Sequence, residues 1–358
     1  MKDEDAHIHV MAALKENTFK VPRAAKWEYS ALSYTGAMTG ILKTLGWKVD
    51  TVEVAGFTGQ AFLVSTERQN VSTMAVSYQP ALSVFENGIR NAFGWNIQLF
   101  WHNVSCTNCE FCGKYAYSDN ITPQDQNRAK QYFERIKNML RDTNRPLAVL
   151  GIPIPEYFIV NGYEGESYLV STSRPFQKET DSPVNYRNIY APQGFSEIVF
   201  KDKSKPLDNG QRDLDAIKRG IDMAQGKYND SAHITGTSAF DAWAIHLEKG
   251  ENQKEIAEGN SYLASTTAEA LHMAFVFLDR MTNRYQETPQ GIHLARASLE
   301  FKQAAQPIRR WLDIVPIGTK HAQVSEDLIT GSTLIQKSRA HFIEAVDHMK
   351  NAVDEWYN

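Results

Sequence analysis

The residues with the clearest chemical potential are the three cysteines, which lie in one short segment, Cys106-Thr-Asn-Cys109-Glu-Phe-Cys112. His102 lies four positions before the first of them. Thiolates at this spacing can reach one metal ion or one cluster from a single stretch of backbone. The sequence therefore predicts a metal site with Cys106, Cys109, Cys112 and His102 as ligands.

Three interpretations of this segment stay open. Zinc would take the three thiolates in a tetrahedral site with His102 or another residue as the fourth ligand, and ligand count and spacing slightly favour it. An iron–sulfur cluster is the second interpretation, because C-x2-C-x2-C matches the first three ligands of a bacterial ferredoxin; three cysteines would leave one iron open to substrate. The third interpretation is a metal-free segment with reactive thiols or a redox pair.

Other pairings of histidine and carboxylate are weaker signals. Two imidazoles at alternate positions of an extended segment point to the same side and could reach one ion. Glu-x-x-His on a helix is one half of the metal-binding motif of di-iron proteins. The predicted helices hold no second Glu-x-x-His, so polar surface contacts are the favoured interpretation of all these patterns. They are His7 with His9, Glu269 with His272, and the helical set His341, Glu344 and His348.

The elements that must position these residues belong to an ordinary globular chain. It has 358 residues, 42% of them hydrophobic, with a formal charge of −4 and a pI of about 6.2. This length suffices for two domains, and no basic field recruits nucleic acid or an anionic membrane. No apolar run approaches the ~18 residues of a membrane span, and the acidic N-terminus does not resemble a signal peptide. The odd, clustered cysteines favour a reduced, cytoplasmic protein.

The first part of the chain is predicted to mix strands and helices. Residues 30–45 form a helix of small and apolar residues, and 80–93 and 123–142 form amphipathic helices. Strands are expected at 96–101, 146–152, 157–163 and 167–171, the last two as a hairpin, with a further extended segment at 188–200.

Almost all of the chain after the charged linker Lys201–Pro206 is predicted to be helical. The expected helices cover 211–225, 238–248, 260–283, 291–313 and 324–357. The sequence therefore predicts an α+β domain at residues 1–205, which carries the cysteines, and an all-helical domain at 206–358. Aromatic residues along the long helices are typical of packing and are compatible with a homodimer.

This order of elements, with the segments Pro146-Leu-Ala-Val-Leu-Gly-Ile152 and Tyr157-Phe-Ile-Val-Asn-Gly-Tyr163, resembles the papain-like fold of bacteriocin-processing cysteine peptidases. It is also similar to proteins related to the butirosin-biosynthesis acyltransferase, in which a helical domain with Gly-x-x-Ala-x-x-x-Trp-x-x-x-Leu follows. The corresponding stretch here is Gly236 to Leu247, followed by Gly259-Asn260-Ser-Tyr262. The resemblance covers about Trp27 to Met281 and implies a papain-like domain with a substrate cleft.

The Cys–His pair that this resemblance implies is absent from its expected positions. A cysteine should begin the first buried helix, where this chain has Glu28-Tyr29-Ser30, and Glu156 occupies the place of the histidine. A serine without a neighbouring base is hardly nucleophilic, so Ser30 is interpreted as a helix cap. Tyr29, Ser30 and Glu156 are nevertheless the candidate residues of the former cleft.

These observations lead to three hypotheses for function. The first is an enzyme of amide or acyl chemistry on a small molecule or peptide, such as a hydrolase or acyltransferase, with its chemistry moved to the cysteine-bound metal. The second is a non-catalytic, peptidase-like binding module with structural zinc. The third is an iron–sulfur protein that serves sulfur transfer or elimination.

Overall fold

The structure is a computed structural model that describes residues 17–68, 71, 81–102, 123–188, 195–249, 253–317 and 325–357. For residues 101–102, 123–126, 253–257 and 325 it describes the backbone alone. The chain divides into two compact units. The first unit comprises Met1–Val49 and Asn96–Asp202, and the second comprises Asp50–Trp95 and Lys203–Asn358.

The first unit is built on a mainly antiparallel sheet. Its strands run in the order β3-β8-β4-β5-β6-β7, and β1 pairs with β5. Their bounds are β1 Thr18–Lys20, β3 Trp95–His102, β4 Leu147–Leu150, β5 Tyr157–Glu164, β6 Ser167–Ser171, β7 Val184–Asn185 and β8 Phe195–Lys203. The four predicted strands and the hairpin are confirmed. The charged stretch from Lys201 was interpreted as linker, but β8 continues through it to Lys203.

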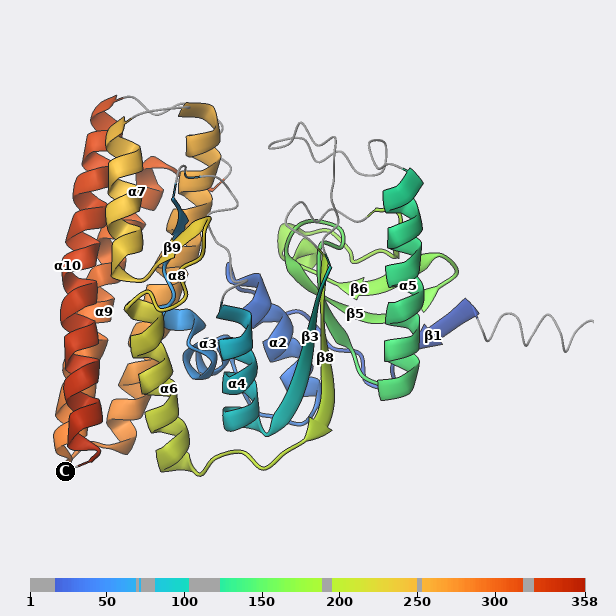
Figure 1. The fold of residues 1–358 in the computed structure, drawn as a ribbon, viewed down its shortest axis with the longest axis horizontal. Coiled ribbons are helices and arrows are strands. Elements are labelled where there is room, and N and C mark those ends of the chain that lie inside the picture. Colours follow the sequence, from blue (N-terminus) through green and yellow to red (C-terminus); the bar gives the residue numbers. More distant parts are fainter. Residues whose placement is uncertain are drawn as a thin grey trace, which may run out of the picture. The chain divides into compact units, whose positions relative to one another are not determined.

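One helix covers each face of this sheet. Val160 on β5 packs in a core with side chains of α5, Pro123–Thr143. Ile159, the preceding residue, reaches α2, Ser33–Thr44, where its Cδ1 lies against Gly40. Consecutive side chains of a strand point to opposite faces, so α5 and α2 lie on opposite sides of the sheet (Figure 1).

Helix α2 is buried along most of its length because its small residues let backbone pass close to it. A Cβ added at Gly36 would lie 2.4 Å from the carbonyl oxygen of Glu28, and one at Gly40 would lie 1.9 Å from that of Lys26. Glycine at both positions therefore admits the extended segment that precedes the helix. The predicted small-residue helix is confirmed.

A group of four aromatic side chains, here the Phe133 cluster, fills the space between α5 and the sheet. The ring of Phe133 lies 4.9 Å from that of Tyr168, 5.2 Å from that of Tyr186 and 6.2 Å from that of Tyr163. All four side chains are buried. Phe133 shares the buried face of α5 with Ala129, Ile136 and Leu140, and this spacing accounts for the helical periodicity of the sequence.

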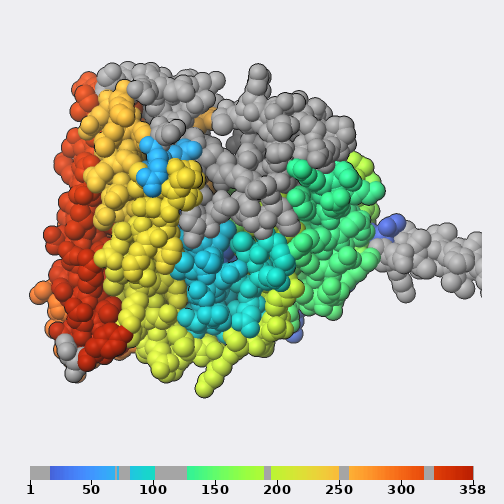
Figure 2. Space-filling view, viewed as in Figure 1, coloured from blue at the N-terminus to red at the C-terminus, as the bar shows by residue number. Residues whose placement is uncertain are grey.

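The second unit is helical apart from a two-stranded pairing of β2, Ser65–Glu67, with β9, His233–Thr235. Helix α10 runs beside α7 and α9, and Figure 2 shows α10 in red next to the gold α7. The helices are α3 Thr51–Thr58, α4 Leu82–Phe93, α6 Asn209–Ala224, α7 Thr237–Lys249, α8 Gln253–Arg284, α9 Pro289–Ile314 and α10 Ser325–Glu355, with the 3-10 turn η1 at Gln60–Phe62.

Local signals in the sequence account for where several of these helices begin. Asp50 accepts a hydrogen bond from the Glu53 N–H (3.0 Å) and the Glu53 carboxylate accepts one from the Asp50 N–H (3.4 Å), a capping box at the start of α3. Thr288 caps α9, whose first residue is Pro289. Gly94, with φ of +63°, ends α4.

The structure confirms the coarse fold class predicted from the sequence. The chain is α+β, with an antiparallel sheet and a helical C-terminal region. The domain boundary between residues 205 and 206 stays a prediction. Among the helices of the described residues, none is both long and apolar enough to cross a membrane.

Candidate functional site

The residues that the sequence predicts for a cleft lie where α2 and β5 begin. Tyr29 and Ser30 precede α2, and Glu156 precedes β5. The Tyr157 N–H donates to the Ser33 hydroxyl across 3.1 Å, which joins the first residue of each element. The structure thus brings the start of α2 and the start of β5 together.

The Trp27 side chain fixes this junction. Its indole N–H donates to the carbonyl oxygens of Tyr157 (3.1 Å) and Ser33 (3.3 Å), and its backbone N–H donates to the Ser171 hydroxyl (3.0 Å). These acceptors belong to β5, α2 and β6, so one residue connects three elements. A buried, multiply bonded indole holds the surface above it rigid.

Four aromatic rings meet at this junction and form the Trp27 cluster: Trp27, Tyr29, Phe158 and Phe176. The Tyr29 and Phe176 rings are 5.1 Å apart, and the Trp27 ring lies 5.8 Å from Phe158, 5.9 Å from Phe176 and 6.5 Å from Tyr29. Trp27 is 6% exposed and Phe158 is 2% exposed, whereas Tyr29 is 63% exposed and Phe176 is 53% exposed. Two buried rings therefore support two exposed rings.

Phe176 is presented by a short 3-10 turn, η3, Arg174–Gln177, which follows β6. The Thr172 hydroxyl donates to the Asp181 carboxylate (2.6 Å) and accepts from the Arg174 N–H (3.1 Å). The same carboxylate accepts from the Thr172 N–H at 3.2 Å. The exposed ring of Phe176 thereby lies on a segment that hydrogen bonds close between Thr172 and Asp181.

Ser30 is buried, and its hydroxyl accepts a hydrogen bond from the Leu32 N–H at 3.0 Å. This contact occupies one lone pair of the oxygen and ties the chain down just before α2, whose N-cap residue Leu32 offers no side-chain cap. A catalytic role for Ser30, Tyr29 or Glu156 stays a prediction.

The described side chains of the first unit include no cysteine and no histidine. Among the phenols, burial raises the pKa of Tyr157 well above its ordinary value, and its hydroxyl shares a hydrogen bond with that of Ser196 (3.0 Å). Tyr157 therefore stays protonated at neutral pH. What the described residues assemble here is a partly exposed aromatic surface, and Cys–His chemistry would need residues outside that part.

The predicted metal ligands cannot be placed. Cys106, Cys109 and Cys112 lie outside the described residues, as does the side chain of His102. In the part of the chain that the structure describes, no three or more His, Cys, Asp or Glu side chains are grouped to hold a metal ion. Zinc or an iron–sulfur cluster at the cysteines stays a prediction.

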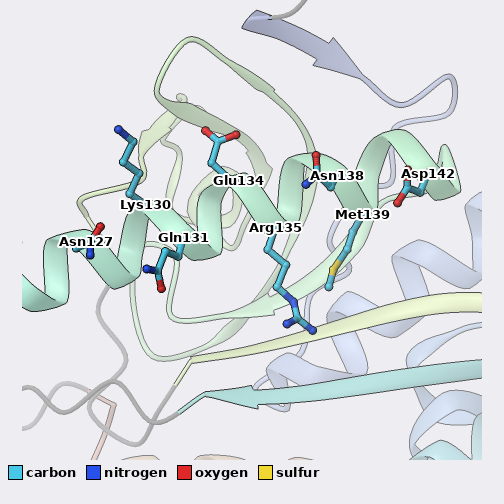
Figure 3. A pocket seen from close by; sticks show the side chains of 8 residues that line it. All are labelled: Asn127, Lys130, Gln131, Glu134, Arg135, Asn138, Met139 and Asp142. Atoms are coloured by element: carbon cyan, nitrogen blue, oxygen red, sulfur yellow. The ribbon is translucent and has the colours of Figure 1, made fainter.

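A hollow of about 690 Å³ runs along α5 (Figure 3). Among its lining side chains, Arg135 approaches two neighbours. Its guanidinium lies 4.0 Å from the Phe100 ring centre, and its Nε lies 3.8 Å from the buried Glu197 carboxylate. All of its lining residues come from this one helix, so it has no opposing wall and is the weaker candidate. They are Asn127, Lys130, Gln131, Glu134, Arg135, Asn138, Met139 and Asp142.

No protein-family model matches the chain, and no curated protein matches it either. The functional interpretation therefore depends on the geometry of the chain's own residues.

Sequence reasoning found one residue of the Trp27 cluster, Tyr29, and missed the other three. Trp27 and Tyr29 alternate in an extended segment, which was a usable signal that they share a side. Phe158 and Phe176 gave no such signal, because 129 or more positions separate them from Tyr29 and only the fold brings them together.

Proposed function

We propose that the first unit is a non-catalytic, peptidase-like binding module that holds an apolar or aromatic side chain of a peptide on the Trp27 cluster. The observation that carries this proposal is the pair of exposed rings, Tyr29 and Phe176, packed 5.1 Å apart over the buried Trp27. Exposed aromatic side chains on a rigid base are typical of the residues that dominate binding energy.

The affinity of an exposed aromatic surface depends on how much side-chain freedom is lost when a ligand binds. A flexible exposed side chain loses rotamer freedom when a ligand binds, which reduces affinity. Tyr29 and Phe176 already contact each other and the Trp27 ring, and Trp27 is hydrogen-bonded to the backbone at two carbonyl oxygens. The two rings are therefore largely ordered before a ligand arrives, and their apolar area is available to it.

The position of the cluster also supports a peptide as ligand. The resemblance to papain-like peptidases implies a cleft between the start of the first buried helix and the strand after the Pro-Leu-Ala-Val-Leu segment. Trp27 bonds to both of these places, at Ser33 and Tyr157. A module that has kept this cleft without the Cys–His pair would bind a peptide and leave it uncut.

The proposal can be tested with capped tripeptides, N-acetylated and C-amidated, whose central residue is Phe, Leu, Ala or Asp. The indole N–H of Trp27 reports binding in ¹⁵N-edited NMR spectra, because it donates to two carbonyls of the site. The Trp27→Phe variant assigns its signal among the seven tryptophans. We expect the Phe and Leu peptides to shift this signal and the Asp peptide to leave it in place.

Single-residue variants locate the binding surface. Tyr29→Ala and Phe176→Ala should each weaken binding of the Phe peptide at least tenfold, since aromatic anchors of this kind contribute about 2 kcal/mol or more. Ile329→Ala on α10 is the matched control, because Ile329 is also 63% exposed. Equal binding by all variants, or cleavage of the peptides by the wild-type protein, would contradict the proposal.

The enzyme with a cysteine-bound metal stays a prediction. Metal analysis of anaerobically purified protein and of its Cys109→Ala variant distinguishes it from the binding module. A metal that is lost in this variant together with turnover of an amide substrate would favour the enzyme.

A further inference from the structure

Two histidines face each other between the last two helices of the second unit. His293 on α9 and His348 on α10 have ring centres 6.0 Å apart, with their ring planes inclined at 36°. Both side chains are half-buried. In the sequence they are 55 positions apart, so only the pairing of α9 with α10 brings them together.

Helices α9 and α10 also meet at a second pair of side chains, two helical turns away from the histidine pair. His341 Nδ1 on α10 lies 2.7 Å from the Glu300 carboxylate on α9. Glu300 lies seven residues after His293, and His341 lies seven residues before His348. Seven residues are two helical turns, about 10.5 Å, so the two pairs are successive layers of one antiparallel contact.

The two layers differ in how their polar atoms are satisfied. In the layer formed by Glu300 and His341, the His341 imidazole has a carboxylate partner. In the other layer the Nδ1 atoms of His293 and His348 are both buried, and neither has a hydrogen-bond partner. A buried polar atom without a partner costs about 1–3 kcal/mol, and such atoms frequently mark a bound ion or water.

We propose that His293 and His348 form a two-imidazole binding site for a divalent d-block cation, which clamps α9 to α10. Neutral imidazole is a preferred ligand of zinc, copper and nickel ions. With metal–nitrogen bonds of about 2.0–2.1 Å, two imidazoles on one ion have ring centres about 5.2 Å apart at a tetrahedral angle and about 6.4 Å apart when opposed. The observed separation lies between these limits.

The ion would keep open coordination positions. Among the described residues, no third His, Cys, Asp or Glu completes the set, so water would fill the remaining positions. A site with two protein ligands exchanges its ion more readily than a closed structural zinc site. The ion would link α9 to α10 at a layer where the Nδ1 atoms of His293 and His348 otherwise have no hydrogen-bond partner.

The test uses the full chain with Cys106, Cys109 and Cys112 replaced by Ser, which removes the predicted thiolate site from the measurement. Bound Zn²⁺ is counted by equilibrium dialysis, and bound Cu²⁺ is examined by electron spin-echo envelope modulation, which counts coordinated imidazoles. The variants are His293→Gln and His348→Gln, with His341→Gln as the matched control from the neighbouring layer.

We expect the parent to bind one Zn²⁺ more per chain than His293→Gln or His348→Gln, and His341→Gln to bind as much as the parent. The two-imidazole copper signal should disappear in the same two variants. Zn²⁺ should raise the Tm of the parent and of the control by several degrees and leave the two variants unshifted.

Rescue separates metal binding from a packing role. His348→Cys replaces the imidazole with a thiolate ligand and should restore Zn²⁺ binding, whereas His348→Gln should not. Equal Zn²⁺ binding by the parent and both Gln variants would overturn the proposal. A water molecule would then be the partner of the two Nδ1 atoms in place of a metal ion. Failure of His348→Cys to bind more Zn²⁺ than His348→Gln would overturn the proposal as well.

Discussion

The two aromatic clusters of the first unit lie on the same sheet but differ in exposure. The Phe133 cluster under α5 buries all four of its rings, whereas the Trp27 cluster buries two and exposes two. Both clusters have ring separations typical of favourable aromatic pairs. The difference teaches that similar ring contacts serve stability where water is excluded and leave apolar area open to a ligand where it is not.

The largest expected effect comes from truncating a ring of the Phe133 cluster, and the same truncation in the Trp27 cluster is the comparison. Phe133→Ala should lower the free energy of unfolding by about 3–5 kcal/mol, because it leaves a cavity among buried rings. Phe176→Ala should lower it by about 1 kcal/mol or less, because half of this ring is already exposed. Urea denaturation measures both; similar losses in the two variants would remove the distinction between the clusters.

The buried base of the Trp27 cluster should give an intermediate effect. Trp27→Phe keeps an aromatic ring but removes the indole N–H that bonds to Ser33 and Tyr157. We expect a loss of about 1–3 kcal/mol, since two buried carbonyls lose a donor. Phe158→Leu in the same cluster, which removes no hydrogen bond, is the control in the same denaturation experiment, and an equal loss there would assign the effect to packing.

The smallest expected effect lies at the rim of the Phe133 cluster. Arg187 forms an ion pair with Glu166, and its guanidinium lies 4.5 Å from the centre of the Tyr186 ring. The hydrogen bond from Arg187 lowers the pKa of Glu166 below its ordinary value of 4.5. The stabilisation is therefore present above pH 4.5 and is lost as the pH falls through the lowered pKa.

Glu166→Gln tests this pH dependence. The variant should melt slightly below the wild type at pH 7, and the two Tm values should converge as the pH falls through the lowered pKa of Glu166. Because the pair is exposed, we expect the difference at pH 7 to be no more than about 2 °C. A difference that stays constant over the whole acid range would show that Glu166 contributes by something other than its charge.

The sequence predicts those parts of the fold that local pattern determines. The periodicity of 123–142 and the small residues of 30–45 identified α5 and α2, each to within three residues at either end. Helix α3 escaped prediction although Asp50 and Glu53 provide its capping box, because eight residues carry too little periodicity to stand out.

The candidate sites depend on long-range contacts, which pattern does not reveal. Tyr29 was identified through the resemblance to a peptidase cleft, but its partner Phe176 follows only from the way β6 ends beside the segment before α2. His348 was noted for sharing a helix face with His341, and that face holds no ligand set by itself. Its partner His293 lies on another helix, and only the antiparallel register of α9 and α10 identifies it.

The way the chain alternates between its two units has a consequence for its synthesis. Residues 50–95 belong to the second unit but leave the ribosome before most of the first unit and before all of residues 203–358. Helix α3 packs against α6 and α8, so its apolar side must wait until these helices are made. Expression of residues 203–358 alone would therefore yield a helical unit without its α3 and α4, whereas supplying residues 50–95 as a separate fragment should complete it.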